Sequence, residues 1–489
     1  MTSMHSHQQP QGISRRGALG AIATGFVAST ALGGQAYGAT PTCPPVESAG
    51  KRVRQHLRVL DAVAARHGGD RAAGRPGFEY SARYVEHRLH AAGLRTRRQH
   101  FGYVRTDFVR DTVEQIRPRR RDVIHFPAHG LAASPDGGHI GELVVPRNPF
   151  GDAADSWEGI DARAKVALLQ LRPNTLRGAR QERRTGCHTG GGPSVHQRIA
   201  DDQTAMARQA LVYARAAGVS AVLFYLDQFD FLIGLSFDAP GDISLPPAAA
   251  VYSSAATALR QDMDAGGATV RVDLELRERQ VDTFNVLTVP PDITAPRHLF
   301  GAHLDSVPAG PGIDDNASGS ALLLDLALSL AARAGRRAQF CWWGGEEDGM
   351  RGSRHFVATE PLGLVRGYFN TDMVAAPNYV ISVYGDGPQR HYTDHLAAVG
   401  RPWLEGPIDG MSDQVPFLDA GIPVAGIDTV NSAPARLKDD HEAAVFGGVA
   451  GQPFDPQYHA PGDTLTNIST TALGICTTAS HAALRATTR

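Results

Sequence analysis

Five short clusters of carboxylate and imidazole side chains recur along the second half of the chain. The first holds His303 and Asp305, two positions apart, so both side chains point to the same side of an extended backbone. A carboxylate in that position could fix the tautomer of the imidazole while its other nitrogen binds a metal. A histidine beside an aspartate is more often a surface pair, so this cluster indicates a metal site only in combination with the other clusters.

The second cluster contains Asp314, Asp315, Asn316 and Ser318 among glycines, just before an apolar helix expected over 321–332. Each of these residue types suits a helix N-cap, which is the simpler interpretation. Capping needs only one such residue, however, and this loop supplies four. The excess favours a loop that binds a metal ion.

The third cluster, Glu346-Glu347-Asp348, follows an apolar strand expected over 338–343 and a pair of glycines. Three adjacent acids repel one another unless a cation or solvent relieves the repulsion. Neighbouring side chains point apart, so one glutamate could bind a metal while the other stays free as a general base. An acidic surface turn is the alternative, but the apolar strand and the double glycine favour a functional site.

The last two clusters are centred on Asp372 and on Tyr458-His459. Together the clusters offer two histidines and at least three carboxylates, and no thiolate. Such nitrogen and oxygen donors suit zinc in hydrolytic sites. Two metal ions that share one carboxylate could activate a water molecule and stabilise a developing oxyanion.

The segment that carries these clusters, 280–489, alternates short apolar strands with helices. Strands are expected over 284–289, 299–302, 338–343, 379–384 and 424–427. This alternation predicts an α/β fold, with a mainly parallel mixed sheet covered by helices on both faces. In such sheets the chemistry gathers at the carboxyl ends of the strands, which is where the clusters lie.

The remaining chain divides into three parts. Residues 50–129 begin with helical spacing and are assigned to the N-terminal part of the catalytic domain. Residues 130–275 are richer in short strands broken by glycine and proline, and predict a smaller β-rich insert, with a long loop over 176–205. Residues 1–39 carry Arg15-Arg16 before a short apolar run and small residues, typical of a twin-arginine signal peptide and hence of secretion.

The chain has 489 residues, 42% of them apolar, and a formal net charge of -2. This balance gives no field that would attract nucleic acid or an anionic membrane, so neither is expected as a partner of the mature protein. Four cysteines and no C-x-x-C pair argue against a disulfide scaffold or a thiolate metal site. Cys341 lies in an apolar run and is expected to be a buried free thiol.

The five clusters, in this order, resemble the M28 metallopeptidases, a family of aminopeptidases with two zinc ions. The stretches 412–423 (SDQVPFLDAGIP) and 446–459 (FGGVAGQPFDPQYH) are similar to its secreted actinobacterial members. The resemblance implies a zinc-exopeptidase fold for 280–489. The insert 130–275 resembles, by pattern, a protease-associated domain.

Carried over residue by residue, the resemblance implies two zinc ions per chain. Asp315 would bridge them; His303 and Asp372 would complete one site, and His459 and Glu347 the other. Three further residues would serve catalysis: Glu346 as the general base, Asp305 as the residue that orients His303, and Tyr458 as a hydrogen-bond donor to the oxyanion.

The sequence therefore predicts a secreted dizinc aminopeptidase that acts on peptide or protein N-termini. A pocket near Met411 and Phe417 would favour hydrophobic residues, and Gln414, where some relatives have histidine, would lie at the substrate rim. A carboxypeptidase of the same family is the first alternative; it would need an arginine or lysine to meet the terminal carboxylate. A binding protein that has lost the chemistry is the second, and the presence of every ligand and of Glu346 argues against it.

Overall fold

The computed structural model describes residues 45–172, 195–227, 235, 237, 242–292, 294–331, 337–408 and 412–488. The predicted signal segment 1–39 lies outside these residues, as do Cys43 and Cys187. Cys341 and Cys476 are both buried free thiols, which confirms the prediction for Cys341. Within the described ranges, no helix combines the length and the apolar character that crossing a bilayer requires.

Four parallel strands form the middle of the sheet in the C-terminal half of the chain. In spatial order they are β10 (Ala338–Trp343), β9 (Arg297–His303), β11 (Val365–Thr371) and β14 (Val424–Asp428). Beyond β14 lie β12 (Ser382–Gly385), antiparallel to it, and β13 (Leu404–Glu405), parallel to β12. Beyond β10 lies the antiparallel β8 (Thr269–Thr288). The predicted mixed, mainly parallel sheet is confirmed.

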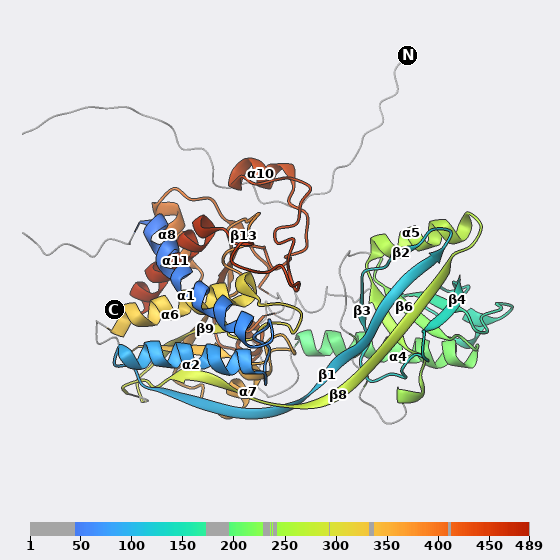
Figure 1. Ribbon diagram of the computed structural model, residues 1–489, viewed down its shortest axis with the longest axis horizontal. Helices are drawn as coiled ribbons and strands as arrows, with labels where there is room; N and C mark the ends of the chain where they lie inside the picture. The colour runs from blue at the N-terminus through green and yellow to red at the C-terminus, as the bar shows by residue number, and fades with distance from the viewer. Residues whose placement is uncertain are drawn as a thin grey trace, which may run out of the picture. The chain divides into compact units, whose positions relative to one another are not determined.

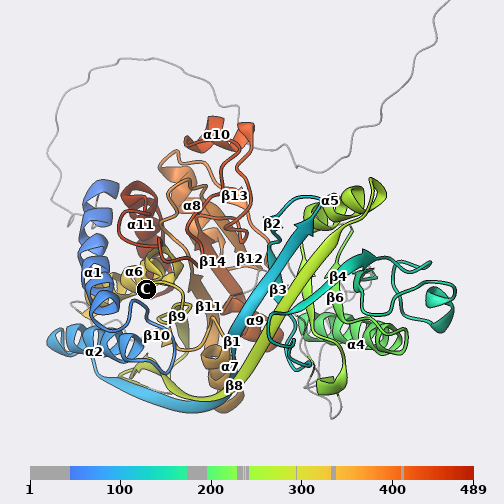
Figure 2. The same ribbon diagram turned by 45° about the vertical axis from the view of Figure 1, so that its right-hand side comes forward.

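Helices cover both faces of this sheet because its strands alternate apolar side chains between two cores. In β10, Trp342 packs into the larger core and Trp343 into the smaller one. The larger core is covered by α1 (Val46–Arg66), α2 (Pro76–Ala91), α6 (Gly319–Ala331), α8 (Arg390–Ala398) and α11 (Thr470–Thr487) (Figure 2). The smaller core is covered by α7 (Arg351–Thr359) and α9 (Gln414–Asp419). The apolar helix predicted over 321–332 is α6.

Strands β1 (Thr96–Arg117) and β8 form a long antiparallel ribbon that the sequence did not predict. Thr96 lies opposite Thr288 at one end and Arg117 opposite Thr269 at the other, and Figure 1 shows the two strands side by side. In the middle of the ribbon Arg105 is paired with Arg279, so a simple alternation of apolar and polar residues is lost there. Strand β8 also runs through the gap that the sequence analysis left between 275 and 280.

The segment predicted to be an insert contains parallel strands, with a helix on each side of them. The strands are β4 (His139–Val144), β5 (Val166–Gln170), β6 (Ala221–Tyr225) and β7 (Ala248–Val251), and β3 (His125–Pro127) is antiparallel to β7. One apolar cluster includes Leu211 of α4 (Val195–Ala216), and the other includes Leu259 of α5 (Ser253–Asp264). The second cluster also takes in Val113 and Leu276, so the packing extends past both predicted limits of the insert.

The loop predicted over 176–205 is wrong for its last part, because α4 begins at Val195. No glycine or proline interrupts 195–216, so nothing in that segment stops the helix. Residues 176–194 lie outside the described chain. The remaining short elements are β2 (Arg121–Asp122), α10 (Asp440–Phe446), and single turns of helix at Ala154–Trp157 and Asp242–Ser244. The segment Ile313–Ser318 is a turn whose backbone is non-helical at Asp315 and Asn316.

Candidate metal centre

The carboxyl ends of β9, β10 and β11 meet at one edge of the sheet, as their parallel pairing requires. His303, the last residue of β9, is paired with Trp343, the last residue of β10. Glu346 and Glu347 follow β10 closely, and Asp372 follows β11 directly. The strand topology therefore brings three of the five predicted clusters together.

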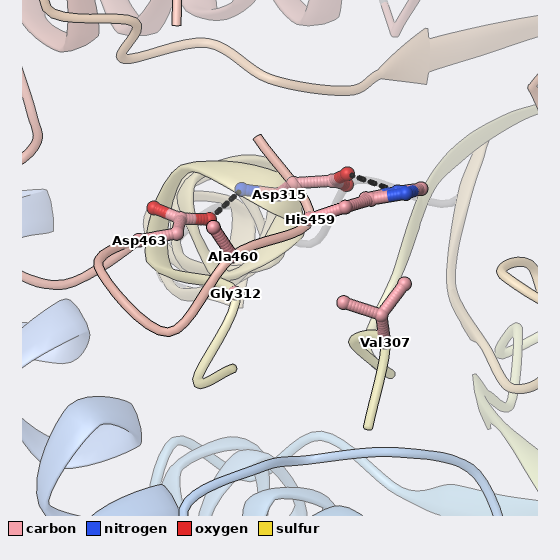
Figure 3. Close-up of a pocket in the computed structure, with 6 residues that line it drawn as sticks. All are labelled: Val307, Gly312, Asp315, His459, Ala460 and Asp463. Atoms are coloured by element: carbon pink, nitrogen blue, oxygen red, sulfur yellow. Dashed lines mark hydrogen bonds and ion pairs between the residues drawn. The ribbon is translucent and has the colours of Figure 1, made fainter. Parts of the chain in front are cut away.

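Asp315 and His459 reach the same edge on two loops that are bonded to one another. Asp315 lies in the turn Ile313–Ser318 before α6, and His459 lies in the loop before α11. The carboxylate of Asp463 accepts the main-chain N–H of Asp314 at 2.8 Å. It also accepts that of Asp315 at 3.0 Å, as Figure 3 shows. Asp463 thereby fixes the loop of His459 against the loop of Asp315.

The carboxylate of Asp315 lies between the two imidazoles. Its Oδ1 is 3.3 Å from Nε2 of His303, and its Oδ2 is 3.2 Å from Nε2 of His459. Nε2 of His303 is also 3.3 Å from Oδ1 of Asp372, and Nε2 of His459 is 3.0 Å from Oε2 of Glu347. The five side chains form two groups of one histidine and two carboxylates, and both groups contain Asp315.

These distances suit divalent metal ions better than direct ion pairs. A charged N–H···O hydrogen bond is typically about 2.7–2.9 Å long, shorter than all four contacts. Two ligand atoms about 2.0–2.1 Å from a tetrahedral zinc ion lie about 3.3–3.4 Å apart. His303, Asp315 and Glu347 can also place one ligand atom each within 4.8 Å of one another. The donor set and its spacing therefore fit two zinc ions.

The electrostatics of Asp315 agree with a bridging position. Burial alone would raise the pKa of its carboxyl group. The contacts with His303 and His459, and the charges of the two imidazoles, instead hold that pKa below its ordinary value. Asp315 is thus ionised at neutral pH and can offer one oxygen to each side.

Glu346 also lies near His303, but its contact is longer than the four described above. Its Oε2 is 3.9 Å from Nε2 of His303. Burial raises the pKa of Glu346 well above its ordinary value against the opposing charge of His303, and the carboxylates of Asp413 and Asp372 add to the rise. A carboxylate whose pKa is raised in this way is suited to accept a proton and to release it again.

Asp305 acts differently from the simple orienting role that the resemblance implied. Nδ1 of His303 is 3.1 Å from the main-chain oxygen of Asp305 and 3.8 Å from its carboxylate Oδ1. The carboxylate instead accepts the main-chain N–H of Glu346 at 3.2 Å and that of Glu347 at 3.4 Å. Asp305 therefore holds the imidazole through its main chain and the turn of the two glutamates through its side chain.

Tyr458 lies against the imidazole of His459, with ring centroids 3.8 Å apart and planes inclined by 22°. Burial raises the pKa of the Tyr458 hydroxyl well above its ordinary value, and the carboxylates of Asp315 and Glu347 raise it further. The hydroxyl therefore keeps its proton at neutral pH and remains able to donate it in a hydrogen bond.

Two donors that the sequence analysis did not assign complete the positioning of the carboxylates. The hydroxyl of Ser412 donates to Oδ2 of Asp372 at 2.6 Å, and the main-chain N–H of Val307 donates to Oε1 of Glu347 at 3.0 Å. Each bond occupies one oxygen and leaves the other facing a histidine. Ser412 belongs to a stretch that was noted for its resemblance, whereas a main-chain donor leaves no mark in the sequence.

Phe417 and Gln414 do not lie at an open substrate pocket or at its rim, where the sequence analysis expected them. Phe417 is fully buried in the smaller core and stacks on Tyr368 with ring centroids 4.0 Å apart, so it cannot line an open pocket. Gln414 is also buried, and its Oε1 accepts from the side-chain amide of Asn370 at 3.1 Å. It therefore lies in the interior rather than at a substrate rim. Met411 is outside the described residues.

Residues 286–484 match the profile of the family described as "Peptidase family M28". The chain is 43% identical to leupeptin-inactivating enzyme 1 of Streptomyces exfoliatus over 185 residues, which cover 36% of this chain and 41% of that protein. It is 32% identical to probable leucine aminopeptidase 2 of Aspergillus fumigatus over 283 residues, which cover 53% of this chain and 55% of that protein. The chain thus spans about half the length of these relatives.

A solved structure, the aminopeptidase from Aneurinibacillus sp. strain AM-1, superimposes on 91% of this chain with a TM-score of 0.60. The match covers 96% of that protein at 22% sequence identity. At this level of identity the likeness concerns the fold. It extends over the described chain well beyond the segment that matches the family profile.

Proposed function

Because residues 286–484 match the profile of peptidase family M28, we propose that the protein is a secreted dizinc aminopeptidase of that family. It hydrolyses the N-terminal peptide bond of peptides or proteins and favours hydrophobic N-terminal residues. The observation that carries this proposal is the position of Asp315, whose two carboxylate oxygens face His303 and His459 at 3.3 Å and 3.2 Å.

Two zinc ions bound by the five ligands would polarise the scissile carbonyl and make water more acidic. Glu346, which is free of the closest ligand contacts, takes a proton from the attacking water and returns it to the leaving amine. The Tyr458 hydroxyl, which retains its proton, donates a hydrogen bond to the oxyanion that develops on the carbonyl oxygen. Asp305 keeps the main chain of Glu346 in place throughout.

The charges around the centre support an aminopeptidase over a carboxypeptidase. The carboxylates of Glu346 and Asp372, 3.9 Å and 3.3 Å from Nε2 of His303, would serve as anionic partners for a free substrate amine. Arg71, whose charge interacts with Asp305, Asp315, Asp463 and Glu347, is fully buried and donates to main-chain carbonyls, so it is not open to a substrate carboxylate.

The preference for hydrophobic N-terminal residues is proposed from the likeness to probable leucine aminopeptidase 2 of Aspergillus fumigatus. The apolar residues next to the ligands do not account for it, because Met373, Val430 and Phe454 pack in a buried cluster against which Tyr458 lies. Secretion rests on the Arg15-Arg16 signal pattern alone.

The proposal is tested by measuring zinc content and activity on the same preparation. The protein should cleave leucine-p-nitroanilide before treatment with a chelator. This activity should be lost after the treatment and should return when zinc is added. N-blocked peptides with a free carboxyl terminus serve as the comparison. Cleavage of the blocked peptides alone would identify a carboxypeptidase and contradict the proposal.

A further inference from the structure

Arg71 lies in the loop between α1 and α2, outside the segment that matches the family profile, yet its side chain reaches the metal-binding loops. The side chain is fully buried. Its Nε donates to the main-chain oxygen of Pro311 at 2.8 Å, and its Nη2 donates to that of Gly312 at 2.6 Å. Its Nη1 donates to the main-chain oxygen of Leu304.

These three carbonyl groups belong to the two segments that carry the shared ligand set. Leu304 directly follows His303, and Gly312 lies three residues before Asp315. A single guanidinium group therefore joins the end of β9 to the turn that holds the bridging carboxylate. Because it is planar and presents its donors in a fixed fork, it also fixes the direction in which each carbonyl points.

The main chain of Arg71 adds a fourth connection. Its N–H donates to Oγ of Ser306 at 3.0 Å, and Ser306 Oγ in turn lies 3.0 Å from the main-chain oxygen of Gly310. Gly312 leaves no room for a side chain here, because a Cβ atom would come within 3.2 Å of Nη2 of Arg71 and 2.5 Å of Cβ of Ser306. The loop between the two metal-binding segments is thus closely packed around Arg71.

The hydrogen bonds that the guanidinium makes go to neutral carbonyl groups, so its charge is left to act on the carboxylates around it. Asp305, Asp463, Asp315 and Glu347 all interact with this charge. Burying a cation destabilises the folded state unless negative charge lies close by, and burying a cluster of carboxylates does so unless positive charge lies close by. Arg71 and the metal-binding carboxylates therefore stabilise one another.

We propose that Arg71 is a positioning residue for the metal centre, which sets the separation and charge balance of the His303 and Asp315 segments. The inference rests on the proposed dizinc function, because it concerns the same ligands. Lysine cannot replace arginine in this position, since one ammonium group cannot reach carbonyls on both segments with fixed directions. Lysine does retain the charge, so the Arg71→Lys variant separates the contribution of the hydrogen-bond geometry from that of the positive charge.

The test measures zinc affinity rather than activity. Apo-protein prepared with a chelator is titrated with zinc in competition with a chromophoric chelator, for the wild type and for Arg71→Lys and Arg71→Met. Circular dichroism and urea unfolding of each apo-protein record whether the fold is intact. The matched control is Arg75→Lys, since Arg75 lies in the same loop but pairs with Asp70 at 2.7 Å and is partly exposed.

We expect Arg71→Lys to be folded and to bind zinc on the order of 10–100-fold more weakly than the wild type, as removal of partners behind metal ligands typically does. Arg71→Met should be weaker still, and Arg75→Lys should match the wild type. If folded Arg71→Lys binds zinc with wild-type affinity, the inference is overturned. It is also overturned if Arg71→Lys fails to fold, because Arg71 would then be needed for the fold alone. A wild-type protein that binds no zinc would instead overturn the proposed function itself.

Discussion

The hydroxyl of Tyr103 donates a hydrogen bond to the carboxylate of Asp348, which joins the long β1–β8 ribbon to the turn of Glu346 and Glu347. The ring also packs on Gly345, where an added Cβ would come within 3.0 Å of the Tyr103 hydroxyl. The guanidinium of Arg351 lies 5.5 Å from the ring centroid. The ribbon therefore supports the turn that carries the proposed general base.

Tyr103→Phe should lower kcat on leucine-p-nitroanilide by several-fold, on the order of the free energy of one hydrogen bond, about 1 kcal/mol. The phenyl ring keeps the packing on Gly345, so zinc content and thermal stability should change little. Tyr80→Phe is the control, because Tyr80 is an exposed tyrosine that stacks on His67. Equal kcat values for Tyr103→Phe and the control would show that the contact does not position the turn.

Glu346→Gln should lower kcat by about 10²–10⁴-fold, which is the usual contribution of one general base. Zinc content should stay at the wild-type value, since Glu346 is not among the four shortest ligand contacts. Glu360→Gln is the matched control: Glu360 is paired with Arg97 at 2.7 Å and contacts none of the ligands. Undiminished kcat in Glu346→Gln would assign the base to another residue.

Asp325 connects three helices and should make the fold sensitive to acid. Its carboxylate on α6 accepts from Arg52 of α1 at 2.8 Å, and lies 2.8 Å from Nε2 of His481 on α11. Burial alone would raise the pKa of Asp325, but the hydrogen bonds to Arg52 and His481 lower it from 3.8 to about 2. A carboxyl group whose pKa is lowered in the folded state stabilises that state above its unfolded pKa.

Asp325→Asn should therefore lower the free energy of unfolding by roughly 2 kcal/mol at pH 7, at about 1.4 kcal/mol for each pKa unit. The difference from the wild type should shrink as the pH falls from about 4 towards 2, because the wild-type carboxylate then becomes protonated. Urea unfolding across this range measures it. Glu47→Gln, which breaks an exposed pair with Lys51 on α1, should have little effect at any pH. A constant difference for Asp325→Asn down to pH 2 would rule out the ionic origin.

The residues that bear the chemistry could be predicted because parallel strands place them. His303 ends a buried apolar strand, and Glu347 and Asp372 come just after two others, so that local pattern, with the M28 resemblance, indicated a shared edge. The apolar helix and the strand Ala338–Trp343 could be predicted because both consist almost entirely of apolar residues. Whether the five residues bind zinc in the proposed groups stays a prediction.

The features that the sequence could not predict depend on contacts between distant segments. Arg71 is more than 200 positions from each carbonyl to which its side chain donates, and nothing in its own neighbourhood separates it from a surface arginine. Phe417 was misassigned because an aromatic residue can face either the core or the solvent, and periodicity does not distinguish the two. The ribbon was missed because charged residues interrupt its alternation.

The most direct test of the central claim is the number of zinc ions bound per chain in the wild type and in Asp315→Ala, measured by mass spectrometry of the native protein. Because Asp315 contributes an oxygen to both groups, the wild type should hold two zinc ions and Asp315→Ala should lose both or nearly both. A His481→Ala variant removes a contact with Asp325 instead of a proposed zinc ligand, so it should keep two zinc ions. A wild-type chain without zinc, or an Asp315→Ala chain that still holds two ions, would contradict the account.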